Sequence, residues 1–186
     1  LISLKDEINL MMYDEIIRNY NEKSNVHWIF VSNWIKQRSE ELINIKFKKY
    51  DVIPNIIDSE TFKYVEKNPE QRKNVFFIRR FDDCNKYAID LNVRAILELS
   101  KRKCFENMNF NIYGTGDTYD KLIEPLLKFK NVHFYREFLT HEEIAKKHKE
   151  NGIAFFPTRY DAQGVSMCEA AMSGLAVVTS DNDAVK

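Results

Sequence analysis

The feature that most constrains this chain is a regular alternation, from about residue 74 onward, of short apolar segments with longer amphipathic ones. Between the apolar segments lie stretches whose apolar side chains recur at helical spacing. Strands that alternate with helices in this way are typical of βαβ units, which place a mainly parallel sheet between two layers of helices. The sequence therefore predicts an α/β fold with a Rossmann-like, mainly parallel sheet and helices on both faces. The predicted strands of this sheet are residues 75–78, 110–113, 132–135, 153–156 and 175–179.

The first part of the chain shows a looser pattern. Residues 5–20 have apolar side chains at helical spacing and are followed by a polar loop. From residue 26 onward, two short strand-like segments flank a helix that Ser32 and Asn33 would cap. We therefore predict that residues 1–25 are a helical lead-in or the remnant of a preceding domain. Residues 26–186 would then form one ligand-binding domain.

Charge and cysteine content narrow the class of protein. The chain has 28 Lys and Arg residues against 28 Asp and Glu residues, so no net field recruits nucleic acid. Three widely spaced cysteines, Cys84, Cys104 and Cys168, show neither a disulfide framework nor the spacing of a zinc site. No apolar run approaches the roughly 20 residues that span a bilayer, and charges interrupt the N-terminus too early for a signal peptide. We therefore expect a cytoplasmic protein.

The two ends of the chain predict that it is a piece of a longer protein. It begins at Leu1 rather than at a methionine, and it stops at Lys186 directly after a predicted strand and its loop. We therefore expect the ligand-binding domain to be truncated at its C-terminus.

Basic residues follow the first strand of the predicted sheet, and in such sheets ligands bind at the carboxyl ends of the strands. Arg80 leaves the strand and Lys86 precedes the next helix, so both side chains are predicted to point into one cleft. A guanidinium fork and an ammonium point charge would together neutralise a diphosphate. The alternative is two solvated basic residues in a loop.

Glycines mark two further strand ends. Gly114 and Gly116 follow the second strand, where glycine lets the backbone approach a ligand and the next helix start can hold an anion. The third glycine of a dinucleotide fingerprint is missing, so a simple tight turn explains these two equally well. Gly164 follows the fourth strand, and Val165 and Ser166 then offer free N–H groups at a helix start.

Two carboxylates flank that second glycine turn. Asp161 lies in the loop, and Glu169 falls more than a turn into the helix. They can face opposite ends of a bound nucleotide sugar, with Glu169 accepting both ribose hydroxyls and Asp161 near the sugar. The alternative for Glu169 is an exposed helical glutamate. Its apolar neighbours instead predict a largely buried helix, where an unpaired carboxylate is costly.

Taken together, these motifs resemble the C-terminal domain of the family 4 (group 1) glycosyltransferases, which have two Rossmann domains (the GT-B type). That family carries two acids with seven residues between them, and Asp161 and Glu169 occupy these positions. Its glycine–arginine and lysine–glycine phosphate signatures resemble Arg79-Arg80 and Lys86-Tyr87. The match runs from about residue 26 to the end. It also includes Ile53-Pro54-Asn55-Ile56, the turn Gly114-Thr115-Gly116 and the segment Glu169-Ala170-Ala171-Met172-Ser173-Gly174.

The resemblance implies one half of a GT-B architecture and retaining transfer of a sugar from a nucleoside diphosphate donor to a glycan, lipid or other acceptor. The donor would be a UDP- or GDP-sugar, with no metal and no cofactor. Arg80 and Lys86 would stabilise the leaving diphosphate, Asp161 would bind the donor sugar and Glu169 the ribose. Donor-binding positions would further include Gly114, Gly116, Gly164, Val165 and Ser166.

The resemblance also implies a missing N-terminal domain that binds the acceptor. The isolated fragment would then bind donor weakly and transfer nothing, because the cleft needs two walls. A role in polysaccharide biosynthesis and peripheral contact with a membrane, through Lys101-Arg102-Lys103, fit a lipid-linked acceptor.

The chain departs from the family pattern at four places. Asp161 is one methylene shorter than the family's glutamate, and Ile56 and Tyr87 replace glycines. Arg79 replaces the glycine before Arg80, and the alignment favours Arg80 as the phosphate-binding arginine. These departures leave open a non-catalytic domain that binds nucleotide or acts as a scaffold. A sugar-nucleotide epimerase, which shares the double-Rossmann architecture, is a further alternative.

Metal chemistry has little support in the sequence. Asp181-Asn182-Asp183 imitates the acidic metal-binding motif of another glycosyltransferase fold, but the surrounding signature differs. The four histidines show no metal-ligand spacing. We therefore assign no residue to a metal.

Overall fold

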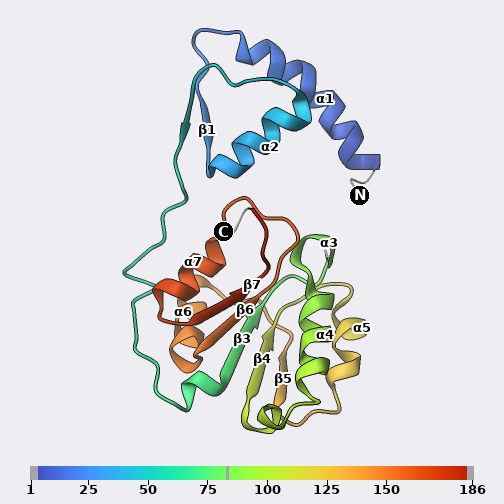
Figure 1. Ribbon diagram of the computed structural model, residues 1–186, viewed down its shortest axis with the longest axis vertical. Helices are drawn as coiled ribbons and strands as arrows, with labels where there is room; N and C mark the ends of the chain where they lie inside the picture. Colours follow the sequence, from blue (N-terminus) through green and yellow to red (C-terminus); the bar gives the residue numbers. More distant parts are fainter. Residues whose placement is uncertain (1–3, 83, 184–186) are drawn as a thin grey trace. The chain divides into compact units, whose positions relative to one another are not determined.

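The computed structural model describes residues 4–82 and 84–183, and the chain divides into two compact units, Leu1–Asn55 and Ile56–Lys186 (Figure 1). This division differs from the predicted boundary at residue 25. The two strands that follow residue 25 pair with each other and not with the larger sheet. They therefore belong to the first unit.

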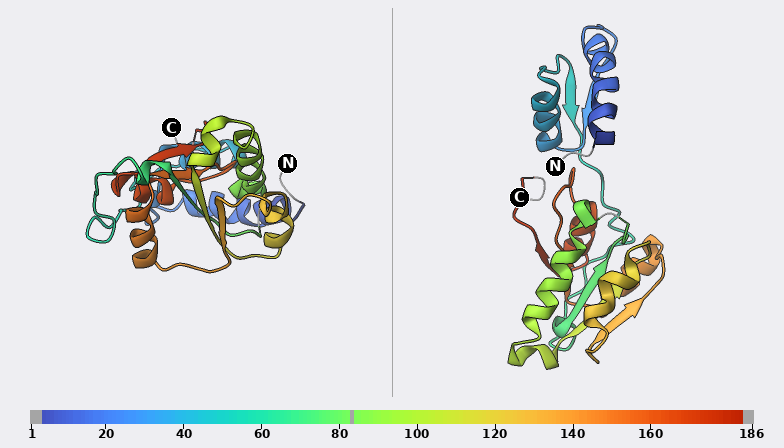
Figure 2. Two further views of the ribbon diagram at one scale, coloured as in Figure 1. Left: turned by 90° about the horizontal axis from the view of Figure 1, so that it is seen from below. Right: turned by 90° about the vertical axis from the view of Figure 1, so that its right-hand side faces the viewer.

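The first unit is a small α/β arrangement. Its elements are α1 (Leu4–Asn21), β1 (Trp28–Phe30), α2 (Asn33–Ile43) and β2 (Tyr50–Val52). The strands β1 and β2 are parallel, and the right-hand view of Figure 2 shows this pair between α1 and α2. Helix α2 begins as predicted, because the Ser32 side chain accepts a hydrogen bond from the Ile35 N–H at 3.2 Å.

The second unit contains a five-stranded sheet with the order β5-β4-β3-β6-β7, in which every pair is parallel. The predicted Rossmann-like sheet is therefore confirmed. The strands are β3 (Asn74–Ile78), β4 (Asn109–Tyr113), β5 (Val132–Tyr135), β6 (Ile153–Phe156) and β7 (Ala176–Thr179). The α-helices are α3 (Cys84–Tyr87), α4 (Ile89–Leu99), α5 (Tyr119–Ile123), α6 (His141–Glu150) and α7 (Val165–Met172). Short 3-10 helices cover Gln71–Lys73, Lys103–Asn107 and Glu124–Leu126.

Helices cover both faces of this sheet. Phe76 and Phe77 are neighbours on β3, so their side chains point to opposite faces. The Phe76 ring lies 5.2 Å from the ring of His148 on α6. Phe77 packs against Phe81, which in turn lies 4.6 Å from the ring of Tyr119 on α5. Figure 1 accordingly shows α4 and α5 on one side of the sheet and α6 and α7 on the other.

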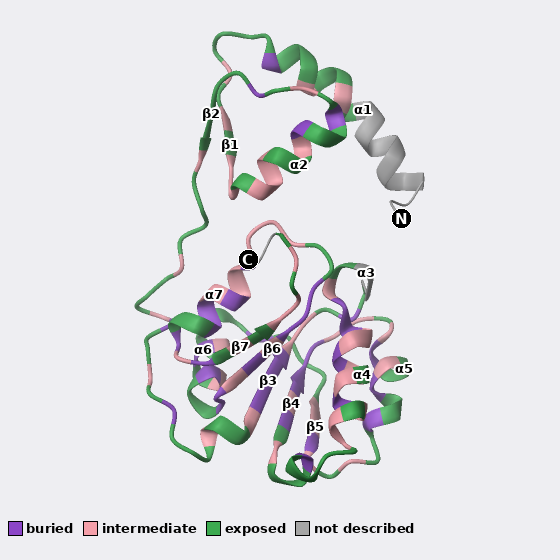
Figure 3. Ribbon diagram, viewed as in Figure 1, coloured by how far each residue is buried: buried purple, intermediate pink, exposed green. Residues whose placement is uncertain are grey.

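The core of the second unit is aromatic and continuous. Figure 3 shows buried residues concentrated along β3, β4 and β6. The helix that follows β4 is short, because α5 ends at Ile123. Pro125 lacks an N–H group, so the chain continues as a 3-10 turn. The largest fully buried side chains here are Phe62, Phe76, Phe81, Phe110, Phe156, Ile89, Ile96 and Leu126.

The segment between the two sheets is fixed to α6 and α7. Lys67, which is buried, donates from Nζ to the carbonyl of His148 at 2.7 Å. The Val65 N–H donates to the carbonyl of Ser173 just after α7. No helix among residues 4–82 and 84–183 is both long and apolar enough to cross a membrane.

Candidate functional site

The strand order of the larger sheet reverses between β3 and β6. The chain moves from β3 to β4 and β5 toward one edge, and it then returns to β6 on the other side of β3. In doubly wound sheets, ligands bind at this switch point, in the crevice outside the carboxyl ends of the two strands. The loops that follow β3 and β6 are therefore the first place to look for a site.

A cleft of about 230 Å³ lies at these strand ends. It is formed by the ends of β3 and β4, the loop between β5 and α6, and the first residues of α6 and α7. Of the residues predicted from sequence, Arg80, Gly114 and Ser166 line it. The full lining consists of Ile78, Arg79, Arg80, Tyr87, Gly114, Thr115, Glu137, Phe138, Leu139, His141, Ile144 and Ser166.

The glycine turn after β4 is packed tightly against the loop after β3. A Cβ atom at Gly114 would collide with the carbonyl oxygen of Arg79, and one at Gly116 would collide with the Asp82 carboxylate. Both glycines also have positive φ angles, 154° and 150°. Close packing between two loops therefore requires these glycines, as the tight-turn interpretation expected. Gly114 reaches the cleft, whereas Gly116 is not part of its lining.

Arg80 is the exposed member of the arginine pair. Its side chain is 70% exposed, and its Nε and Nη2 atoms bind Asp82 Oδ2 at 3.0 and 2.6 Å. Asp82 Oδ1 also accepts a hydrogen bond from the Asp117 N–H at 3.0 Å. The hydrogen bonds from Arg80 lower the pKa of Asp82 below its usual value. Arg80 is therefore anchored at the outer side of the glycine turn.

Arg79, unlike Arg80, lies against aromatic rings and not against a carboxylate. Its Cζ atom lies 4.5 Å from the ring centroid of Phe156 at the end of β6 and 5.6 Å from that of Tyr87. Its Nε atom is buried and has no hydrogen-bond partner among the described residues. Burial lowers the pKa of Arg79, and the negative charges of Asp161 and Glu169 oppose this effect. Sequence reasoning did not place Arg79 in the site, although it noted that the residue replaces a glycine.

Asp161 holds the loop that leads into α7. Its Oδ1 atom accepts hydrogen bonds from the N–H groups of Ala162 and Gly164, at 2.8 and 3.1 Å. Gly164 has a φ angle of 76° and forms the N-cap position of α7, with Val165 as the first helical residue. A short acidic side chain thus fixes the turn that presents the helix start.

Glu169 is a buried residue of α7. The residue is 7% exposed, as predicted, but its helix is only partly buried, because Ala171 and Met172 are exposed. Among the described residues, none forms a hydrogen bond or ion pair with its carboxylate. Burial raises the pKa of Glu169, and the charges of His141 and Arg79 partly counteract this. A buried, unpaired carboxylate is costly unless something satisfies it.

Lys86 connects the loops that follow β3 and β6. Its carbonyl oxygen accepts hydrogen bonds from the Thr158 hydroxyl at 3.0 Å and from the Arg159 N–H at 2.9 Å. Its Nζ atom lies 5.0 Å from the ring centroid of Tyr87. The backbone of Lys86 therefore fixes α3 beside the switch point, and its exposed side chain lies next to a cleft residue.

Sequence reasoning missed one wall of the cleft entirely. Glu137, Phe138 and Leu139, together with His141 at the start of α6, come from the loop after β5. That loop has neither glycines nor a charged motif, so no pattern singled it out. Its position after a parallel strand was the available signal.

The acidic segment 181–183 has no metal-binding surroundings. Within the part of the chain that the structure describes, no three His, Cys, Asp or Glu side chains group closely enough to hold a metal ion. The Asn182 amide instead donates to the carbonyl of Thr158 at 3.0 Å, which ties the loop after β7 to the loop after β6.

The parallel sheet, the reversed strand order and the cleft at the switch point define a Rossmann-like α/β domain. Residues 72–186 match the family model described as "Glycosyl transferases group 1". This match covers more than half of the chain, and the chain therefore belongs to the group 1 glycosyltransferases.

The curated relative that the chain matches is an "Uncharacterized 41.2 kDa protein in cps region" of Klebsiella pneumoniae. The two are 28% identical over 124 residues, which cover 66% of this chain and 32% of that protein. The chain thus spans about a third of the length of that relative.

Solved structures extend the likeness beyond the family match. TarM is 25% identical with a TM-score of 0.69, and the match covers 93% of this chain and 32% of TarM. WaaG, a glycosyltransferase involved in lipopolysaccharide biosynthesis, is 18% identical with a TM-score of 0.63, over 81% of this chain and 43% of WaaG. The WaaG likeness shows the fold alone. These neighbours confirm that the chain is a fragment of a GT-B fold.

Proposed function

We propose that the protein containing this chain transfers a sugar from a nucleoside diphosphate donor to an acceptor, with retention of configuration, and that this chain holds the donor. The observation that carries the proposal is the cleft at the switch point. There Arg79 and Arg80 after β3 and Ser166 at the start of α7 line one space. The acidic pair Asp161 and Glu169 lies close enough for its charges to raise the pKa of Arg79 against the effect of burial. Membership in the group 1 glycosyltransferases supports sugar transfer as the reaction at this site.

The two ends of the donor would occupy different parts of the cleft. Glu169 would accept hydrogen bonds from the ribose hydroxyls, which would satisfy its buried carboxylate. The base would lie toward the loop after β5, where Phe138 is 79% exposed and Glu137 can accept hydrogen bonds.

The diphosphate would lie between the basic residues after β3 and the start of α7. The backbone N–H groups of Gly164, Val165 and Ser166 lie at that helix start, where anions are favoured. The family resemblance assigns Arg80 and Lys86 to the leaving diphosphate. Positive charge there stabilises the negative charge that develops as the bond to the sugar breaks, without a metal ion.

A uridine donor is the first to test. Two similar structures contain UDP. One is a mutant of S. aureus TarM in complex with fondaparinux, alpha-GlcNAc-glycerol and UDP, and the other is the pneumococcal O-GlcNAc transferase GtfA in complex with UDP and GlcNAc.

The name of the Klebsiella relative refers to a cps region. We therefore propose a glycan or lipid-linked acceptor of a surface polysaccharide, bound by a domain that precedes this chain. Contact with a membrane would be peripheral.

A non-catalytic donor-binding domain is the second candidate. Asp161 Oδ1 already accepts loop N–H groups, and Tyr87 narrows the place where the family has a glycine. Sugar transfer or donor hydrolysis by the full-length protein would exclude this candidate.

Calorimetric titration of the chain with UDP, GDP and ADP, with and without magnesium, tests donor binding. We expect one nucleotide to bind without metal and Glu169→Ala to weaken it by about tenfold or more, because charged hydrogen bonds to the ribose are lost. The variant should fold about as stably as the parent, since no described residue pairs with the carboxylate that it removes.

The control is Glu98→Ala, which removes an exposed helical glutamate that pairs with Lys101 at 2.7 Å. Nucleotide affinity should stay unchanged in this variant. Equal affinity of the parent and Glu169→Ala for every nucleotide would contradict the ribose assignment.

A further inference from the structure

Two consecutive arginines leave β3, and their hydrogen-bonding states differ. Arg80 is already engaged, because its Nε and Nη2 atoms bind Asp82 Oδ2. Asp82 is itself fixed, since its other oxygen accepts from the Asp117 N–H and lies where a side chain at Gly116 would be. A ligand that draws Arg80 away from Asp82 must therefore break an ion pair, whereas a ligand beside the pair meets only the remaining N–H donors of Arg80.

Arg79 has donors to spare. A guanidinium carries five N–H donors. The Nη1 atom of Arg79 donates to the carbonyl of Ile78 at 3.3 Å, and its buried Nε has no partner among the described residues. The described carboxylates also form no ion pair with it. A half-buried cation whose Nε donor is unsatisfied is costly, so a ligand that accepts hydrogen bonds from this guanidinium gains affinity from relieving the cost.

Arg79 lines the cleft beside two aromatic rings. The Phe156 ring lies against the guanidinium at 4.5 Å, and Tyr87 lies farther out at 5.6 Å. Aromatic contacts take up the face of the planar group, whereas its N–H groups lie in the plane and stay available. Phe156 ends β6 and Arg79 follows β3, so the guanidinium sits in the switch-point crevice itself.

The start of α7 supplies the second half of an anion site. Ser166 lines the same cleft as Arg79, and a helix start favours negative charge through its N–H groups and its dipole. An anion placed between them would be bound by a fork of N–H donors on one side and backbone N–H groups on the other. A diphosphate has the charge and the number of oxygen atoms that this arrangement requires.

We propose that the Arg79 guanidinium binds the diphosphate of the donor against the start of α7, while Arg80 stays paired with Asp82. The proposal rests on the proposed function and changes one assignment within it. The glycine position of the family signature, occupied here by arginine, would then be the phosphate-binding position in this protein.

Calorimetric titration with UDP and with UMP separates the terminal phosphate from the rest of the nucleotide. We expect Arg79→Gln to weaken UDP binding at least tenfold and UMP binding less than about threefold, because the variant loses contacts to the phosphate that UMP lacks. Arg80→Gln should change either affinity less than about threefold. Arg79→Lys should give an intermediate loss for UDP, since it keeps a charge but not the fork.

Asp82→Asn provides a matched test of the ion pair. Under our proposal the variant leaves UDP affinity within about twofold, because Arg80 does not reach the ligand. A rise of about tenfold would mean that Asp82 restrains a phosphate-binding Arg80, and this would overturn the proposal. Far-ultraviolet circular dichroism and the thermal midpoint check that each variant folds. A variant of Arg79 that does not fold leaves Arg80→Gln and Asp82→Asn to decide.

The outcomes distinguish failure of the Arg79 assignment from failure of the donor site. If the parent binds UDP and only Arg80→Gln weakens it, the donor site stands and the role of Arg79 is refuted. If the parent binds UDP and neither arginine variant weakens this binding, the role of Arg79 is also refuted. If neither this chain nor the full-length protein binds any of UDP, GDP and ADP, both the proposed function and the Arg79 assignment fail.

Discussion

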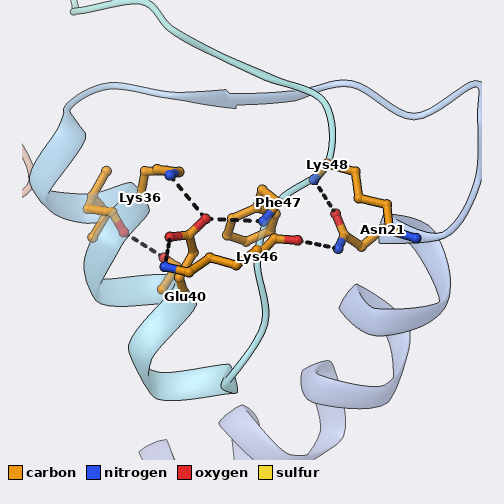
Figure 4. A network of polar contacts seen from close by, with 8 residues as sticks. Asn21, Lys36, Glu40, Lys46, Phe47 and Lys48 are labelled. Carbon is orange, nitrogen blue, oxygen red and sulfur yellow. Dashed lines mark hydrogen bonds and ion pairs between the residues drawn. The ribbon is translucent and has the colours of Figure 1, made fainter.

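The two compact units bury different kinds of side chains. In the first unit, the carboxylate of Glu40 is 3% exposed and accepts hydrogen bonds from Lys36, Lys46 and the Phe47 N–H, at 3.0, 2.8 and 3.1 Å (Figure 4). Asn21 joins the same region to α1, because its amide donates to the Lys46 carbonyl at 2.8 Å. In the second unit, the buried positions are mostly aromatic and aliphatic side chains that form one cluster.

This difference shows how each unit is held together. The apolar buried side chains described in the first unit are Ile43 and Phe47, so polar contacts there do much of the positioning. Burial alone would raise the pKa of Glu40, but hydrogen bonds from Lys46, Lys36 and the Phe47 N–H lower it to about 2. The first unit is therefore expected to respond to charge, and the second to lost volume.

The chain carries a built-in probe for this comparison. Both of its tryptophans, Trp28 and Trp34, lie in the first unit. Tryptophan fluorescence therefore reports on the first unit, whereas far-ultraviolet circular dichroism reports on the helices of both units. Each prediction below uses the two signals against each other.

The largest effect is expected from a cavity in the second unit. Phe76 is fully buried between Tyr113, His148 and Phe156. Phe76→Ala should lower the free energy of unfolding of this unit by about 3–5 kcal/mol, because it removes buried area and leaves a void. Urea unfolding should show an early transition by circular dichroism and an unchanged one by fluorescence. Equal shifts in both signals would mean that the units do not unfold separately.

Mild acid should destabilise the second unit before the first. Burial, and to a smaller extent the charge of Lys67, lower the pKa of His148 to about 4 from its usual 6.5. The unfolded state then binds the proton more readily, so stability is full above about pH 6.5 and is lost as pH falls toward 4. The loss in the second unit should reach up to about 3 kcal/mol.

Unfolding by circular dichroism at several pH values between about 7 and 4 measures this loss. His148→Gln should flatten the dependence on pH, even if it lowers stability at neutral pH, because the titrating group is gone. The same exchange at half-buried His133 is the matched control. An unaltered slope in His148→Gln would show that other groups cause the dependence.

The first unit should keep its central ion pairs through that same pH window. The depressed pKa of Glu40 means that its contribution is present above about pH 4.5 and is lost as pH falls toward 2. Glu40→Gln at neutral pH should lower the stability of the first unit by about 1–3 kcal/mol, because charged hydrogen bonds at a buried site are weakened.

Fluorescence-monitored unfolding measures this effect, and Glu41→Gln is the control next to it in sequence. Glu41 is exposed and pairs with Arg38 at 3.0 Å, so its loss should cost no more than about 0.5 kcal/mol. Similar effects of the two variants would contradict a special role for the buried carboxylate.

Much of the second unit could be predicted from the sequence, because its strands are short apolar runs between polar loops. Predicted strands 132–135 and 153–156 coincide with β5 and β6. The unit boundary could not be predicted in this way. It depends on the pairing of β1 with β2, and nothing in two three-residue strands says which sheet they join.

The site was predicted in outline and not in detail. Spacing placed Arg80, Gly114 and Ser166 at one set of strand ends, and the cleft includes all three. Both arginines line the cleft, and the sequence does not say that Arg80 pairs with Asp82 while Arg79 lies against Phe156. The second contact joins residues that are far apart in sequence. Exposure and pairing are properties of the folded chain that a motif does not encode.

The tight packing around Gly114 and Gly116 bears on how a mutational screen of this protein should be scored. Almost any replacement at either position would be depleted, whether or not the protein handles a nucleotide, since a Cβ atom there meets the loop after β3. A screen that records activity alone would rank these glycines beside Glu169. Measuring soluble yield in the same library would separate positions that shape the protein from positions that touch its ligand.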